Sequence, residues 1–191
     1  MPKGEEVSLT VITGPMLAWK TSELIRRVQR AKFAKKRVVA FKPAIDDRYH
    51  TTQITTHDGS AIDAIAVHSL VKNFSTLGPW DGVAVDEIQF FEDLPDMLDL
   101  VAMIARQVEV VMCGLDMDFK GEPFPATAGV MAIADRVFKL TSICAKCGSD
   151  AIHTQRVLDG KEVTSGDTVQ VGGVDIYEPR CRRCFVTRSN A

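Results

Sequence analysis

Apolar and polar positions along the chain follow a repeating pattern of strands and helices. The β-branched run at residues 7–13 (VSLTVIT) is followed by Gly14 and is typical of a buried strand. Residues 20–36 place apolar side chains at mostly helical spacing among lysines and arginines, which predicts an amphipathic helix with a solvated basic face. Similar apolar runs predict three further strands, at 37–43, 82–91 and 109–116.

Helices are expected between and after these strands. Helical periodicity covers 94–106, and a short helix is expected at 126–134, ahead of a last strand at 136–141. The strand–helix–strand repetition predicts a parallel sheet with right-handed crossovers and helices on both faces. Ligands of such sheets bind at the carboxyl ends of the strands. Four polar or glycine positions are expected there: Gly14, Asp86, Glu87 and Asp116.

Composition narrows the class of protein. A chain of 191 residues with 46% hydrophobic residues suits one globular domain with a small appendage. The formal net charge of −2 argues against a protein that coats phosphate backbones, which usually has a strong basic excess. No apolar run approaches the roughly 20 residues that span a bilayer, and the first residues lack the apolar stretch of a secretory signal. We therefore expect a cytoplasmic protein that binds neither nucleic acid nor membrane, with reduced cysteines.

The cysteines form a regular pattern in the last quarter of the chain. Near Thr141 the apolar periodicity gives way to glycine, cysteine and arginine, so a domain boundary is placed there. Two C-x-x-C pairs follow, and they can present four thiolates to one structural, tetrahedral zinc: Cys144, Cys147, Cys181 and Cys184. Four unrelated buried thiols are the weaker alternative, because the same C-x-x-C spacing occurs twice. Residues 148–180 are expected to form an extended loop or hairpin held at its base by the metal, and Cys113 is expected in the core.

Residues 14–21 (GPMLAWKT) match the phosphate-loop pattern G-x-x-x-x-G-K-[ST], except that Trp19 stands at the second glycine. In such a loop, backbone N–H groups point at phosphate oxygens, Lys20 reaches the outer phosphates and Thr21 would bind magnesium. A bulky residue at positive φ is strained by roughly 1–3 kcal/mol. An ordinary strand–helix turn that contains a lysine remains an alternative on these residues alone.

Asp86 and Glu87 follow the apolar run 82–85 (GVAV) at the end of a predicted core strand. A magnesium-linked aspartate and a general base for an incoming hydroxyl are expected at such a position. Strand-end acids that merely face water are the alternative. The presence of this pair and the loop 14–21 in one sheet favours phosphoryl transfer.

Several segments in chain order resemble the type II thymidine kinases over about residues 8–188: GPM-x-x-x-KT, FKPAIDDRY, THDG, VDEIQFF, GLDMDFKGEPF, TQR, VGG-x-D-x-Y and both C-x-x-C pairs. The resemblance implies an α/β fold, with a parallel-sheet P-loop (RecA-like) nucleotide-binding domain at 1–140 and a small zinc-binding domain with a lasso loop at 141–191. It implies transfer of the ATP γ-phosphate to the 5′-hydroxyl of thymidine or deoxyuridine, with Mg²⁺ accompanying ATP and structural Zn²⁺. A cytoplasmic homotetramer with dTTP as feedback inhibitor is implied as well.

The resemblance also implies roles for individual residues. Glu87 is the implied catalytic base. The implied ATP and phosphate site consists of Gly14, Pro15, Met16, Leu17, Ala18, Trp19, Lys20, Thr21, Asp46, Arg48, Asp86 and Gln89. The implied nucleoside site consists of Met16, Leu115, Phe119, Phe124, Thr154, Thr168, Val169, Gln170, Val171, Gly172 and Tyr177. Three of these have structural alternatives, since Phe119 or Phe124 could be core and Tyr177 could pack on the cysteine pairs.

The chain departs from the family pattern at residues 17–19, which are Leu-Ala-Trp where the family usually has Phe-Ser-Gly. Three interpretations are open. The loop turns Trp19 outward and the chain is an active kinase; the chain binds nucleoside or nucleotide without turnover; or Trp19 is an engineered change to donor binding. A different hypothesis makes the cysteine pairs, with Arg180, Arg182, Arg183 and Arg188, a nucleic-acid-binding ribbon, and the acidic balance of the chain disfavours it.

Overall fold

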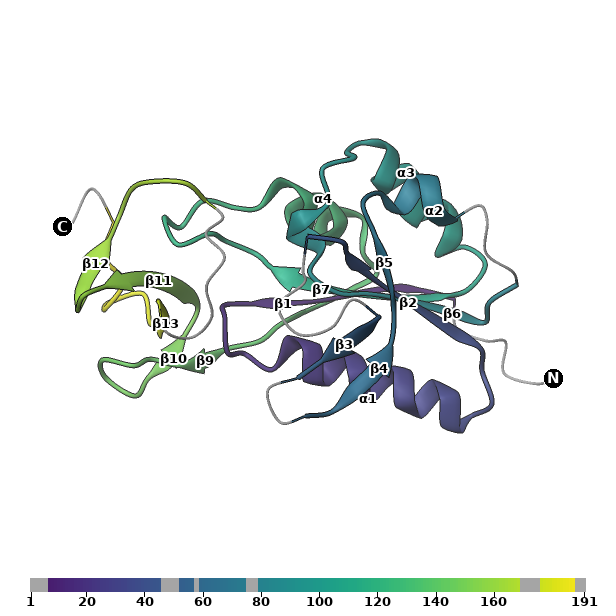
Figure 1. Cartoon of the computed structure of the whole chain (residues 1–191), viewed down its shortest axis with the longest axis horizontal. Helices are drawn as coiled ribbons and strands as arrows, with labels where there is room; N and C mark the ends of the chain where they lie inside the picture. The colour runs from purple at the N-terminus through teal and green to yellow at the C-terminus, as the bar shows by residue number, and fades with distance from the viewer. Residues whose placement is uncertain (1–6, 46–51, 57–58, 75–78, 169–175, 188–191) are drawn as a thin grey trace.

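A six-stranded parallel sheet forms the centre of the computed structural model, which describes residues 7–45, 52–56, 59–74, 79–168 and 176–187 (Figure 1). Its strand order is β5-β2-β6-β7-β1-β8, and every pairing is parallel. The strands are β1 (Leu9–Gly14), β2 (Val38–Pro43), β5 (Ile65–Val67), β6 (Gly82–Val85), β7 (Glu109–Leu115) and β8 (Arg136–Lys139). The predicted α/β class and parallel sheet are confirmed.

Both faces of the sheet are covered (Figure 1). Helix α1 (Lys20–Phe33) and the hairpin of β3 (Gln53–Thr55) and β4 (Ala61–Asp63) pack on one face. Helices α3 (Asp96–Ile104) and α4 (Pro125–Ile133) pack on the other, next to the short helix α2 (Leu70–Phe74).

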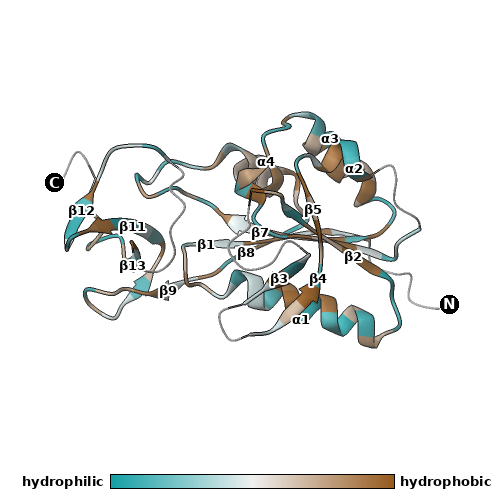
Figure 2. Ribbon diagram, viewed as in Figure 1, coloured by the Kyte–Doolittle hydropathy of each residue, from teal (hydrophilic) through white to brown (hydrophobic). Residues whose placement is uncertain are grey.

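Successive side chains of each strand point to opposite faces of the sheet, so the hydrophobic core has one half on each face. Val11 packs with the α3 and α4 side, whereas its neighbour Ile12 packs with α1. Hydrophobic residues, brown in Figure 2, accordingly concentrate in the strands of the sheet. Within the described residues, α1 is the longest helix at 14 residues, and no helix is both long and apolar enough to cross a membrane.

The predicted strand at 82–91 is wrong in its second half. Strand β6 ends at Val85, and residues Ile88–Phe90 form a single 3₁₀ turn, η1. Glu87 has φ 52° and ψ 48°, a left-handed conformation that stops the strand and turns the chain. The sequence pattern also missed β3, β4, β5 and α2, because elements of three to five residues are too short to show a period.

The C-terminal module, defined here as residues 142–187, lies beyond the carboxyl ends of the sheet strands (Figure 1). It contains the pair β9 (Ser142–Ile143) and β10 (Asp150–Ala151). It also contains the three-stranded sheet β12 (Lys161–Val163), β11 (His153–Leu158) and β13 (Tyr177–Arg180). Residues 148–180 were expected to be an extended loop or hairpin, and the described part holds a β11–β12 hairpin that is extended by β13.

Buried Gln155 joins the end of β12 to the segment that follows β13. Its amide oxygen accepts a hydrogen bond from the backbone N–H of Val186 at 2.8 Å, and its amide nitrogen donates to the carbonyl of Val163 at 3.3 Å. Gln155 has no exposed surface, and both polar atoms of its amide are hydrogen-bonded. A buried amide is stable only when its polar atoms are satisfied in this way.

Candidate functional site

The loop at residues 14–21 connects β1 to α1 at the carboxyl edge of the sheet. Gly14 has φ 138°, and a Cβ atom there would lie 2.4 Å from the carbonyl oxygen of Leu140, so only glycine fits. Trp19 has φ 56° and ψ 28°, the left-handed conformation in which glycine is usually found. Leu17 has φ 60°, a second left-handed residue that the sequence pattern did not reveal. The loop therefore carries two strained non-glycine positions.

The side chains of the loop divide between solvent and interior. Trp19 is 66% exposed, whereas its neighbour Ala18 is buried. The indole ring therefore does not occupy the interior of the loop. The outward side chain that the first of the three interpretations expects is therefore present, whereas the activity that it expects stays a prediction.

Lys20 is the first residue of α1 and bends back across the loop. Its Nζ atom donates to the carbonyl oxygen of Pro15 at 2.7 Å. Burial lowers the pKa of Lys20, and the carboxylates of Glu87, Asp86 and Asp116 act against that shift. The ammonium group thus lies among acidic groups, which favour its charged form.

The acidic pair contacts the loop. The Oδ1 atom of buried Asp86 accepts hydrogen bonds from the backbone N–H of Glu87 at 2.9 Å and from the hydroxyl of Thr21 at 3.5 Å. The thiol of Cys113 on β7 also donates to Asp86 Oδ1, at 2.7 Å. Burial raises the pKa of Cys113 well above its usual value, and the charge of Asp86 raises it further. Cys113 is a core residue, as expected, and is in addition a direct partner of Asp86.

Glu87 and Gln89 form a second connection at the same edge. The amide nitrogen of Gln89 donates to Glu87 Oε2, and its amide oxygen accepts the backbone N–H of Leu115 at 2.9 Å. A Cβ atom at Gly114 would lie 2.6 Å from that amide oxygen, so glycine is required for this approach. These bonds fix the Glu87 carboxylate between η1 and the end of β7.

Three of the predicted nucleoside-site residues contact Arg156: Phe119, Thr168 and Tyr177. The guanidinium of buried Arg156 lies 3.8 Å from the ring centroid of Phe119 and donates to the hydroxyl of Tyr177 at 2.7 Å and 3.1 Å. It also donates to the carbonyl of Thr168 at 3.3 Å. Phe124 is buried at the start of α4, and its N–H donates to the carbonyl of Asp116. Arg156 itself was not predicted as a site residue, although it is the arginine of the TQR segment.

A turn beside this group is organised by Asp118. Its Oδ1 atom accepts the backbone N–H groups of Lys120 at 2.8 Å and Glu122 at 3.0 Å. Its Oδ2 atom accepts the hydroxyl of Thr168 at 3.3 Å, and the same hydroxyl accepts from Lys120 Nζ at 3.1 Å. Asp118 thereby links the segment after β7 to the C-terminal module.

Met16 and Thr154, both predicted site residues, are joined by a hydrogen bond although they are 138 residues apart in the chain. The hydroxyl of Thr154 accepts the backbone N–H of Met16 at 3.0 Å, so Thr154 contacts the phosphate loop. Six predicted site residues lie outside the described residues: Asp46, Arg48, Val169, Gln170, Val171 and Gly172.

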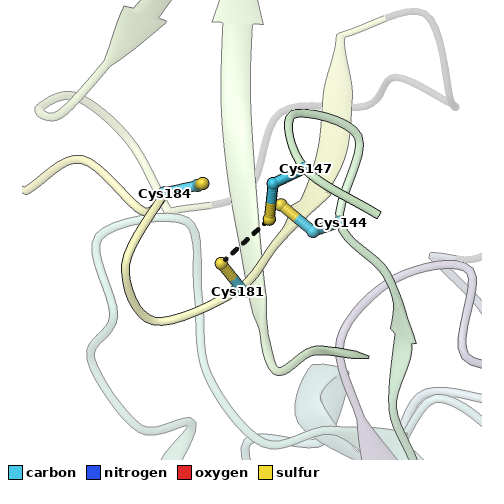
Figure 3. Close-up of side chains that lie close together, drawn as sticks. All are labelled: Cys144, Cys147, Cys181 and Cys184. Carbon is cyan, nitrogen blue, oxygen red and sulfur yellow. Dashed lines mark hydrogen bonds between the residues drawn. The ribbon is translucent and has the colours of Figure 1, made fainter. Parts of the chain in front are cut away.

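The two cysteine pairs form one cluster (Figure 3). The four Sγ atoms lie within 4.8 Å of one another, and those of Cys147 and Cys181 are 3.6 Å apart. Hydrogen bonds from Ser149 lower the pKa of Cys147 to about 6, whereas hydrogen bonds with Cys181 and Cys147 raise the pKa of Cys184 to about 12. The thiols of the cluster therefore differ in how readily they lose a proton to a cation, and Cys147 loses its proton more readily than Cys184. Four sulfur ligands fit a structural zinc ion and leave no position for water activation.

The family model for thymidine kinases matches residues 7–185. The match includes the loop 14–21, the acidic pair after β6 and both cysteine pairs. It covers nearly the whole chain and leaves out only short segments at the two ends. The chain therefore belongs to the thymidine kinase family.

Proposed function

We propose that the chain transfers the γ-phosphate of ATP to the 5′-hydroxyl of thymidine or deoxyuridine and releases ADP and the nucleoside monophosphate. The observation that carries the proposal is the contact between Thr21 of the phosphate loop and Asp86 of the acidic pair. Glu87 follows Asp86 directly, so a metal-binding and a proton-accepting carboxylate lie beside one loop. Membership of the thymidine kinase family supports an ATP-dependent nucleoside kinase.

The donor site consists of the loop, Lys20 and the N-terminal end of α1. Thr21 and Asp86 are the residues that would hold Mg²⁺, since a hydroxyl and a carboxylate are ligands that this ion accepts. Mg²⁺ supplies neutralisation of the charge on the phosphates. Lys20 leaves the Pro15 carbonyl when phosphate oxygens compete for its ammonium group, because a charged acceptor binds more strongly than a neutral one.

Glu87 is the proposed general base. Its carboxylate takes the proton of the 5′-hydroxyl while that oxygen forms a bond to the γ-phosphorus atom and the bond to the β-phosphate oxygen breaks. The amide of Gln89 holds the Glu87 carboxylate in place through its bond to Oε2. The left-handed backbone at Glu87 turns the chain at this residue, directly before η1.

The acceptor site is proposed around the group that Arg156 connects. The residues Phe119, Phe124 and Tyr177 supply aromatic surface for the base, and Met16 and Leu115 lie at the loop and at the end of β7. Arg156 holds Phe119 and Tyr177 together through its stacking and hydrogen bonds.

The assembly and regulation are proposed from the family. We propose a cytoplasmic homotetramer that is inhibited by dTTP. Exposed Val137 and Phe138 on the edge strand β8 support a subunit contact, since an apolar sheet edge favours association. Sedimentation of the purified chain at several concentrations tests the tetramer, and the rate of phosphate transfer with and without dTTP tests the inhibition.

The second candidate function is binding of nucleoside or nucleotide without turnover. The observation that favours it is the pair of left-handed residues in the loop, Leu17 and Trp19. If about 2 kcal/mol of strain opposes donor binding, affinity for ATP falls about thirtyfold.

Transfer of labelled γ-phosphate to thymidine distinguishes the two functions. The unmodified chain is compared with Glu87→Gln and Trp19→Gly in the presence of Mg²⁺. The kinase proposal expects turnover by the unmodified chain and its loss in Glu87→Gln. Silence of the unmodified chain together with activity in Trp19→Gly would establish the binding function instead.

A further inference from the structure

The phosphate loop holds two residues in a conformation that their side chains disfavour. Leu17 has φ 60° and Trp19 has φ 56°, and no glycine lies between Gly14 and the start of α1. Such strain persists only where surrounding contacts over-determine the backbone.

Two hydroxyl groups of the C-terminal module bond directly to the loop backbone. The Ser142 hydroxyl donates to the carbonyl oxygen of Leu17 at 3.0 Å, and the Thr154 hydroxyl accepts the N–H of Met16 at 3.0 Å. Both residues are nearly fully buried, at 4% and 3% exposure. Hydrogen bonds in such positions are exposed to little competition from water.

The two bonds set the orientation of two peptide groups. In a planar trans peptide the C=O and N–H point in opposite directions. Holding the Leu17 carbonyl at Ser142 therefore turns the N–H of Ala18 away from the C-terminal module. Holding the Met16 N–H at Thr154 fixes the preceding peptide in the same manner. The backbone on both sides of Leu17 is thus held from outside the loop.

We propose that Ser142 and Thr154 are positioning residues that lock the phosphate loop in its strained conformation from the C-terminal module. Ser142 lies in β9, two residues before Cys144, and Thr154 lies in β11, so the cysteine module has a structural role at the donor site. The consequence for ATP binding rests on the proposed kinase function. The effect on the loop itself does not.

Hydrogen–deuterium exchange of the loop tests the lock without any ligand. Ser142→Ala and Thr154→Val each remove one bond, and we expect amides of residues 16–19 to exchange about 2- to 10-fold faster in each. Thr154→Ser keeps the hydroxyl and is expected to restore the slow exchange. The matched controls are Ser8→Ala and Thr127→Val, which change buried hydroxyl residues of the sheet domain, and both should leave loop exchange unchanged.

A second measurement follows the donor site. The affinity for a non-hydrolysable ATP analogue with Mg²⁺ is expected to fall about 2- to 10-fold in Ser142→Ala and in Thr154→Val, with the control variants near the unmodified chain. The proposed lock of the loop is overturned if loop exchange in both variants equals that of the unmodified chain. It is also overturned if loop exchange becomes faster by the same factor in the control variants. Faster loop exchange in a chain that binds no ATP analogue supports the lock and refutes the kinase function, so the two failures are distinguishable.

Discussion

Replacing Trp19 by glycine and by alanine separates backbone strain from the effect of the indole ring. Both replacements remove the ring, and little buried area is lost because Trp19 is 66% exposed. Alanine keeps a Cβ atom at a backbone with φ 56° and ψ 28°, whereas glycine does not. A Cβ atom in the left-handed region costs about 1–2 kcal/mol, and glycine loses about 0.4–1 kcal/mol through the entropy of the unfolded chain. We therefore expect Trp19→Gly to be about 1 kcal/mol more stable than Trp19→Ala.

Urea and thermal unfolding of the zinc-loaded protein measure this difference. About 1 kcal/mol corresponds to a melting temperature about 2–4 °C higher for Trp19→Gly in a chain of this size. The matched control is Gln29, an exposed residue inside α1, where glycine should be about 1 kcal/mol less stable than alanine. Equal stability of the two Trp19 variants, or greater stability of alanine, would refute the left-handed backbone at position 19.

Three further predictions concern other parts of the chain. Cys113→Ala removes a hydrogen-bond donor to Asp86 and should weaken Mn²⁺ binding about 2- to 10-fold, whereas Cys113→Ser should retain the binding. Electron paramagnetic resonance of Mn²⁺ with an ATP analogue measures this affinity. Equal loss in both variants would contradict the role of Cys113. Glu23→Gln should cost a few tenths of a kcal/mol at pH 7, because Glu23 pairs with Arg26 and Arg27 on α1. These arginines lower the pKa of Glu23 from 4.5 to about 2. The stability that Glu23 contributes is therefore fully present above pH 4.5 and is lost as the pH falls through 2. The free energies of unfolding of the unmodified chain and of Glu23→Gln, measured in urea from about pH 7 to 2, should accordingly converge at low pH. Removal of zinc by a chelator should lower the melting temperature, and hydrogen exchange should become faster in β9 and β13 earlier than in the central sheet. An unchanged melting temperature in protein that contains no metal would exclude a structural ion.

The candidate site was partly predictable because its chemistry follows local patterns. A glycine after a β-branched run, a lysine and threonine at the start of a helix, and two acids after GVAV each occur within a few residues of a predicted strand end. Parallel strands bring their carboxyl ends to one edge, so the proximity of Thr21 and Asp86 follows from the fold class. The regular spacing of the cysteines likewise placed four sulfur atoms in one cluster.

The remaining contacts depend on packing between segments that are distant in sequence. Cys113 reaches Asp86 only because β7 lies beside β6, and Arg156 stacks on Phe119 only because the C-terminal module lies against the segment after β7. The periodicity of apolar residues indicates which face of a helix or strand is buried. It does not indicate which side chains of other elements contact that face.

The sequence by itself determined the parallel α/β sheet, the place of the loop at residues 14–21 with its unusual Trp19 and the cysteine cluster, because periodicity and short motifs act within single elements. Only the tertiary structure decided the conformation of that loop. Leu17 is left-handed as well as Trp19, and Ser142 and Thr154 bond to the loop across 125 and 138 residues of chain. The physical reason is that strain at these positions is unfavourable locally and is maintained by contacts that exist only once the two parts of the chain have packed together.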